Sequence, residues 1–124
     1  MNVFRMVLGV LMAGAVLGCA NLPAPEDIGP GTNFNQARKG LYNAGWSPYD
    51  LYQHGIVQRQ PEFEGHARRL RAAGLVEVEG CDDARGVCTF NYRQGSRCMR
   101  LTTQGDKLPE MRVTSVASDC PATR

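Results

Sequence analysis

The sequence predicts an α+β fold in which two N-terminal helices pack on a four-stranded antiparallel β-meander that disulfides staple together. Apolar residues recur with a helical period up to residue 74 and alternate with polar residues from residue 75 onward. Helices followed by strands form a two-layer α+β arrangement. Four of the five cysteines lie in the strand region. We expect residues 33–124 to form a single domain.

Residues 1–18 have the form of a secretory signal peptide. Arg5 supplies a positive charge, an apolar run follows over residues 6–17, and Gly18 ends it with a small residue. Because a spanning helix needs roughly twenty apolar residues, we expect export rather than a permanent transmembrane anchor.

The end of this segment, Val16-Leu17-Gly18-Cys19, resembles the lipobox of bacterial lipoproteins. The resemblance implies cleavage before Cys19 and membrane anchoring by palmitate-type acyl chains on that cysteine. Val16 stands where the family most often has leucine, and Leu17 is larger than the usual residue there. The alternative is an ordinary secretory signal cut near Ala20. In a lipoprotein, alanine rather than aspartate at position 20 implies the outer membrane, facing the periplasm.

Residues 19–32 contain three prolines and two glycines. This composition predicts a flexible, lipidated tether that holds the domain off the membrane.

Two helices are expected behind the tether. Asn33 is a good N-cap for a helix over residues 34–44 that ends at Gly45. A turn follows over residues 46–50, and residues 51–60 are mostly loop.

The second helix is expected from Pro61 to Gly74, because proline is favoured at the first helical position. Acidic residues in its first turn and basic residues near its end suit the helix dipole. The charged residues are Glu62, Glu64, Arg68, Arg69 and Arg71, and the apolar stripe is Phe63, Ala67 and Leu70.

Alternation predicts strands over residues 75–79, 87–93, 97–103 and 111–118. With the turn at Gly95 and Ser96, Tyr92 lies opposite Met99 and Phe90 opposite Leu101, and Cys98 faces the other side. Pairing the last two strands around Pro109 gives the opposed pairs Arg100/Ser118, Thr102/Val116 and Cys98/Cys120.

Setting Cys19 aside leaves four cysteines, which suggests two disulfides in an oxidising compartment, with three connectivities open. The strand register favours Cys98–Cys120. Cys81 and Cys88 flank the first hairpin, which favours Cys81–Cys88.

Little in the sequence points to catalysis or to a metal. The four cysteines lack the close pairs of structural zinc sites, and no Cys-x-x-Cys motif exists. His54 and His66 are expected at the surface or at an edge. We therefore expect no enzyme activity, no cofactor and no metal.

Three charged groups have a functional and a simpler interpretation. Glu77 and Glu79 alternate on one strand face, which favours a solvated face over a hydrolase pair. Asp82 and Asp83 are interpreted as turn-forming residues rather than as part of a calcium-binding loop, because the repeated oxygen ligands of such a loop are missing around them. Arg68, Arg69 and Arg71 are interpreted as ordinary solvated charges rather than as residues that contact lipid headgroups.

Six residues are candidates for partner binding. Trp46, Tyr49 and Tyr52 would form a binding hot spot if exposed and would cap the core if buried, and burial is favoured. The other three, Asp82, Asp83 and Arg85, lie in the loop between Cys81 and Cys88.

The signal peptide contains one of the fourteen lysine and arginine residues. The rest of the chain therefore has thirteen Lys+Arg and twelve Asp+Glu, and this near-neutral balance does not indicate nucleic-acid binding.

The layout resembles that of the outer-membrane barrel-assembly accessory lipoprotein and of the β-lactamase inhibitor fold. The chain also resembles small exported bacterial proteins without assigned activity, in its Ala-Gly-Trp, Gly-Leu-Val-Glu-Val-Glu and Cys stretches.

We expect a non-enzymatic envelope lipoprotein that binds a protein as an assembly or accessory factor. The alternative is a periplasmic inhibitor or immunity protein against a cell-wall hydrolase or toxin, and a lipid or glycan binder is a third hypothesis. The oligomeric state stays open.

Overall fold

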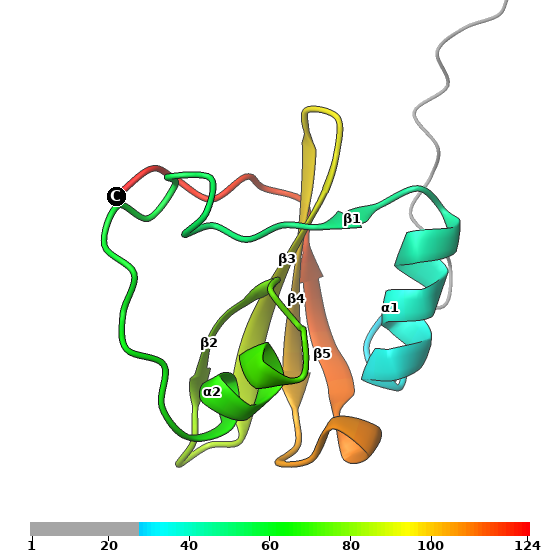
Figure 1. The fold of residues 1–124 in the computed structure, drawn as a ribbon. Helices are drawn as coiled ribbons and strands as arrows, with labels where there is room; N and C mark the ends of the chain where they lie inside the picture. The colour runs from blue at the N-terminus through cyan, green and yellow to red at the C-terminus, as the bar shows by residue number, and fades with distance from the viewer. Residues whose placement is uncertain (1–27) are drawn as a thin grey trace, which may run out of the picture.

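The computed structural model describes residues 28–124, so the predicted signal peptide and Cys19 lie outside the described residues. Residues 28–124 form two helices and a five-stranded antiparallel sheet (Figure 1), which confirms the α+β class. The prediction of four strands that all follow the two helices is wrong in one respect, because a fifth strand lies between the two helices in the sequence. The elements are α1 (Phe34–Asn43), β1 (Ser47–Pro48), α2 (Gly65–Ala72), β2 (Val78–Asp82), β3 (Val87–Gln94), β4 (Arg97–Gln104), η2 (Leu108–Glu110) and β5 (Arg112–Ala117).

β1 is the strand that the sequence analysis missed, because residues 46–50 were expected to form a turn. Ser47 and Pro48 pair with Arg93 and Tyr92 of β3. β1 lies at the end of the strand order β1-β3-β4-β5, where a proline does little harm to the hydrogen-bond ladder. Two residues are too few for an alternating pattern to be recognised.

The central β3–β4 hairpin has the predicted register. Phe90 lies opposite Leu101, and Tyr92 lies opposite Met99. Gly95 lies in the left-handed region (φ 58°), as the tight turn requires.

The β4–β5 pairing differs from the prediction by one residue. Arg100 pairs with Ala117 rather than with Ser118, and Thr102 pairs with Ser115 rather than with Val116. Nearer the turn the difference is two residues, because Thr103 pairs with Val113 and Gln104 with Arg112. A bulge between Thr102 and Thr103 inserts one unpaired residue and reduces the difference to one.

Both predicted disulfides are present. Cys81–Cys88 joins directly opposed residues of β2 and β3, with Cα atoms 4.1 Å apart. Cys98–Cys120 ties the start of β4 to the segment after β5.

α1 begins at Phe34 as predicted and ends at Asn43, one residue before the predicted end. The Asn33 side-chain oxygen accepts hydrogen bonds from the backbone N–H groups of Asn35 and Gln36 at 3.0 and 3.3 Å. Gly45 follows the helix with φ 85°, a conformation that glycine adopts freely.

α2 is shorter than predicted, because it begins at Gly65 rather than at Pro61. Glu64 occupies the N-cap without a side-chain cap, and the Asp83 carboxylate instead accepts the N–H of His66 at 3.2 Å. Phe63 lies outside the helix, with its ring packed edge-on against Tyr52. Tertiary contacts of Phe63 and Asp83 therefore place the start of the helix four residues later than predicted.

The predicted tether extends too far toward the domain. Ile28 is 3% exposed and belongs to the hydrophobic core. Gly31 N–H donates to Val113 O, and Val113 N–H donates to Thr32 O, so residues 31–32 lie along β5. These residues are therefore part of the folded domain.

Both helices cover one face of the sheet. The Phe34 ring of α1 lies 4.1 Å from the Phe90 ring, and His66 of α2 lies beside Cys88, two residues earlier on β3. Residues two apart on a strand share a face. The segment after β1 and the C-terminal segment run near each other (Figure 1), and Gln58 N–H donates to Arg124 O.

Candidate functional site

A groove lies between α1 and β1. Its volume is about 280 Å³. We call it the α1 groove, and it is lined by Asn35, Arg38, Lys39, Tyr42, Trp46, Pro48 and Tyr92.

Arg38 and Tyr92, which line the α1 groove, form a polar triad with the buried Glu77. Arg38 Nε donates to Glu77 Oε1 at 2.7 Å, and the Tyr92 hydroxyl donates to the same oxygen at 3.1 Å. Burial and the Glu77 carboxylate raise the pKa of Tyr92 well above its usual value, so the phenol keeps its proton as a donor. Burial opposes ionisation of Arg38, yet Glu77 and Tyr92 together raise the pKa of its guanidinium.

Glu77 was expected on a solvated strand face, and this expectation is wrong. The residue is 1% exposed. It precedes β2 in a turn, where Val78 N–H donates to Leu75 O, so the expected alternation does not begin until after Glu77. Its second oxygen, Oε2, has no hydrogen-bond partner within the described part of the chain.

The apolar wall of the α1 groove is aromatic. Trp46 is 2% exposed, and the Arg97 guanidinium lies 5.2 Å from the centre of its ring. Tyr42 is 76% exposed, and Val76 is the other large hydrophobic residue of the described chain that is exposed. Tyr42 was not among the residues predicted to bind a partner. The available signal was its place in α1, beside the buried Leu41 and off the apolar stripe.

The other two predicted aromatic candidates lie away from the α1 groove. Tyr49 stacks on His54, and its hydroxyl accepts a hydrogen bond from Arg93 at 3.0 Å. Tyr52 is half-buried, and its hydroxyl donates to Glu79 O at 2.6 Å. Burial of Trp46 and Tyr49, the favoured expectation, is confirmed. His54 is exposed, as expected.

Glu79 was also expected to be solvated, but its side chain is only 13% exposed. It lies at the β2 bulge between Val78 and Gly80, which directs it onto the sheet face opposite the helices. Burial would raise the pKa of Glu79, but contacts from three donors lower it below its usual value. These donors are Arg124, Asn91 and Arg100.

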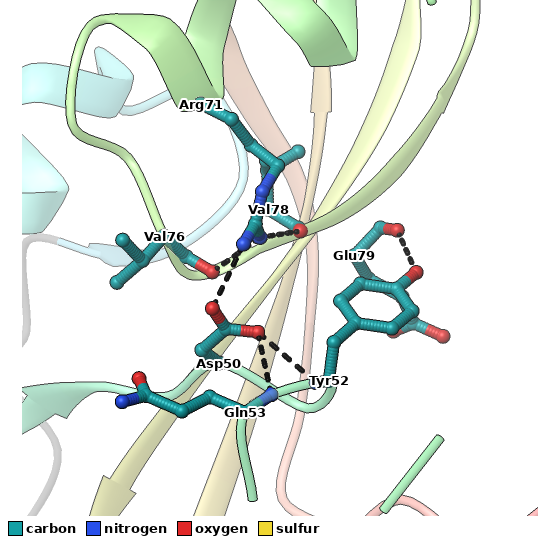
Figure 2. A network of polar contacts seen from close by, with 7 residues as sticks. All are labelled: Asp50, Tyr52, Gln53, Arg71, Val76, Val78 and Glu79. Atoms are coloured by element: carbon teal, nitrogen blue, oxygen red, sulfur yellow. Dashed lines mark hydrogen bonds and ion pairs between the residues drawn. The ribbon is translucent and has the colours of Figure 1, made fainter. Parts of the chain in front are cut away.

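Arg71 organises a second network (Figure 2). Its guanidinium donates to Asp50 at 2.8 Å and to the carbonyls of Val76 and Val78 at 2.9 and 3.4 Å. The guanidinium also lies 4.4 Å from the centre of the Phe63 ring. The expectation of a solvated charge is therefore wrong for Arg71, whereas Arg68 and Arg69 are exposed. This network holds the loop after β1 against α2 and β2.

The predicted Asp82–Arg85 loop forms an exposed turn between β2 and β3. Asp82 Oδ1 accepts the N–H of Arg85, which is the expected role of a turn-forming aspartate. Asp83 caps α2, so part of the loop is committed to the fold. The six predicted partner-binding residues thus do not form one surface.

His66 was expected at an edge, but it is 5% exposed. Its Nδ1 lies 3.5 Å from Cys88 Sγ. Burial lowers the pKa of His66 and Arg69 lowers it further, against the opposing charges of Asp83 and Asp106.

Within residues 28–124, neither helix has the length and apolar character needed to cross a membrane. Comparison of the chain with protein family models, with curated proteins and with solved structures found no match.

Proposed function

We propose that the protein is a non-enzymatic envelope lipoprotein that binds another protein through the α1 groove, as an assembly or accessory factor. The observation that carries the proposal is the exposure of Tyr42 beside a groove with a cationic rim. Tyrosine, tryptophan and arginine are the residue types that dominate protein-binding hot spots. The α1 groove offers two of these types with exposed surface, Tyr42 and Arg38, whereas Trp46 is buried.

The partner segment that fits the α1 groove is acidic. Arg38 and Lys39 line the groove, and none of the seven described lining residues is acidic. The Arg38 side chain remains 30% exposed while its Nε is held by Glu77. An anchored guanidinium loses little conformational entropy when it binds a carboxylate, which favours bidentate recognition.

The groove is built on elements that are fixed before any partner arrives. Trp46 N–H donates to Leu41 O, and the Gln94 side chain donates to Ala44 O. These bonds tie the end of α1 to β1 and β3. Preorganisation of this kind reduces the entropic cost of binding.

The membrane part of the proposal depends on Cys19 and on the sequence before it. Lipidation of Cys19 would place the domain beside the outer membrane, facing the periplasm. The substitution Cys19→Ser should release the protein from washed membranes. Retention of the variant in the membrane fraction would contradict lipid anchoring.

A photocrosslinker at position 42 tests the binding surface. Benzoylphenylalanine in place of Tyr42, in the full chain expressed in its host, should give one discrete protein adduct. The same group in place of Val76, the other exposed large hydrophobic residue, is the matched control. Adducts of equal yield at both positions, or none at position 42, would overturn the assignment of the groove.

Charge reversal supplies a second comparison. The sequence has two lysines, Lys39 in the groove and Lys107 before η2, and both are exposed. Lys39→Glu should weaken the Tyr42 adduct, whereas Lys107→Glu should leave it unchanged.

An inhibitor or immunity protein is the second candidate function. It is favoured by the exposed turn over residues 82–85, which the Cys81–Cys88 disulfide closes at its base. In that case crosslinkers at Arg85 rather than at Tyr42 should capture the partner, and the captured protein should be a cell-wall hydrolase or a toxin.

A further inference from the structure

We propose that reduction of the Cys81–Cys88 disulfide creates a Zn²⁺ site formed by Cys81, Cys88 and His66. This site is separate from the α1 groove and does not depend on partner binding. The three residues come from β2, β3 and α2, so the tertiary fold alone brings them together.

The donor atoms are already close to one another. His66 Nδ1 lies 3.5 Å from Cys88 Sγ, and the ligand atoms of the three residues all lie within 4.8 Å of one another. In a tetrahedral zinc site with bonds of about 2.0–2.3 Å, donor atoms lie roughly 3.5–3.8 Å apart. After reduction, the two sulfurs therefore need only a local side-chain rotation to separate to that distance.

The backbone that carries the donors is held in place by other contacts. Cys81 and Cys88 are directly opposed on paired strands, with Cα atoms 4.1 Å apart. The backbone N–H of His66 is fixed by the Asp83 carboxylate at the start of α2. Since neither restraint involves the S–S bond, the donor positions should survive its reduction.

Reduction supplies the two thiols in a balanced step. A dithiol reductant gives two electrons and two protons to the S–S bond, so Cys81 and Cys88 become thiols and the reductant becomes a disulfide. Zn²⁺ then displaces one proton from each thiol, and the Nδ1 lone pair of His66 provides the third ligand. The oxidation state of zinc does not change.

The resulting charge suits the location. Two thiolates and a neutral imidazole together carry a charge of −2, which offsets that of Zn²⁺, so the loaded centre carries no net charge. Cys88 and His66 are 1% and 5% exposed, and an uncompensated charge there would be costly. Cys81 is half-buried, which leaves a path for the ion and a fourth position for water.

The second disulfide provides a matched control. Within residues 28–124, Cys98 and Cys120 belong to no group of three His, Cys, Asp or Glu side chains that could hold a metal ion. Cys120 is also exposed, and its Sγ lies 3.7 Å from the carbonyl of Ser96.

Cobalt titration of the full chain in detergent tests the site. After reduction with a phosphine, about one Co²⁺ per chain should give thiolate-to-cobalt charge transfer and tetrahedral d–d bands, and Zn²⁺ should abolish both. The oxidised protein should give neither signal. His66→Gln should weaken Zn²⁺ binding by at least roughly 10- to 100-fold, the loss that even outer-shell changes cause.

The double variant Cys98→Ser/Cys120→Ser and the single variant His54→Gln should keep the cobalt spectrum. Circular dichroism of each reduced sample, with and without metal, shows whether the fold persists. A reduced chain that gives no cobalt spectrum, whether folded or not, would overturn the proposal. Cobalt binding of equal strength in Cys81→Ser/Cys88→Ser would do so as well.

Discussion

Arg38 Nε and Glu77 Oε1 lie 2.7 Å apart, although 39 positions separate the two residues in the sequence. The pair joins α1 to the residue that precedes β2. Glu77 has no exposed side-chain surface, whereas Arg38 is 30% exposed at the α1 groove. One side chain therefore stabilises the fold and lines the proposed binding surface.

Removal of the Arg38 charge should destabilise the protein strongly. Arg38→Met leaves the Glu77 carboxylate buried without its cation, which should lower the free energy of unfolding by about 3 kcal/mol. Arg38→Met/Glu77→Leu should recover most of this loss, because a buried ion pair is often replaceable by apolar residues. Urea unfolding at pH 7 measures both effects. Exposed Arg68→Met is the control, and an equal loss in that variant would contradict the role of the pair.

Acid should weaken the loop network around Asp50. Burial would raise the pKa of Asp50, but Arg71 and the backbone N–H groups of Gln53 and Tyr52 hold it below its usual value. A carboxylate with a lowered folded-state pKa stabilises the protein above its unfolded-state pKa of about 4 and loses that contribution as pH falls. Asp50→Asn should therefore be less stable than wild type at pH 7, and this difference should shrink at pH 3.

Glu79 has a lowered pKa as well, so it should add to the acid sensitivity. Chemical unfolding at pH 7, 5 and 3 measures the dependence. Asp119→Asn, which removes an exposed carboxylate, is the control and should retain the wild-type acid slope. A constant difference between Asp50→Asn and wild type across these pH values would rule out the linkage.

The parts of the fold that the sequence predicted correctly depend on local patterns. The N-cap at Asn33 and the Gly95 turn are chosen by residues adjacent in sequence, and the β3–β4 register follows from that turn. Both disulfides could be paired from the expected strand layout. The one-residue error between β4 and β5 did not change the pairing of Cys98, because a disulfide tolerates a range of Cα separations.

The parts that could not be predicted depend on distant partners. Glu77 is buried because Arg38 and Tyr92 lie there to satisfy it, and no pattern around residue 77 reveals either partner. His66 looks like an edge residue within its helix, yet the Asp83 turn and β3 enclose it. His66, Cys81 and Cys88 likewise come together only through the tertiary fold, so the spacing of the cysteines along the chain does not reveal this group.

The two disulfides should differ in their effect on stability. In the chain-entropy model, a cross-link over 22 positions contributes about 3.5 kcal/mol and one over 7 positions about 2.5 kcal/mol. Cys98–Cys120 also holds the C-terminal segment whose Arg124 bonds to Glu79 and to the backbone of Ile56 and Gln58. Cys98→Ser/Cys120→Ser should therefore lower the unfolding temperature more than Cys81→Ser/Cys88→Ser. Calorimetry under non-reducing conditions makes the comparison, and the reverse order would contradict it.

The start of α2 should be sensitive to a single methyl group. Gly65 has φ 53°, and a Cβ there would overlap the Asp83 carboxylate that caps the helix. Gly65→Ala should therefore lose about 1 kcal/mol from left-handed backbone strain and about 1 kcal/mol more from the displaced cap. Gly95 has nearly the same φ, 58°, but nothing lies within 4 Å of its Cβ position, so Gly95→Ala isolates the backbone cost.

Asp83→Ala separates the two contributions at Gly65. In the wild type this substitution should cost about 1 kcal/mol, because the N–H of His66 loses its acceptor. In the Gly65→Ala background it should cost almost nothing, because the cap is already displaced. Urea denaturation of the four proteins gives the coupling between the two sites directly. Additive losses would mean that α2 begins at Gly65 for a reason other than the Asp83 cap.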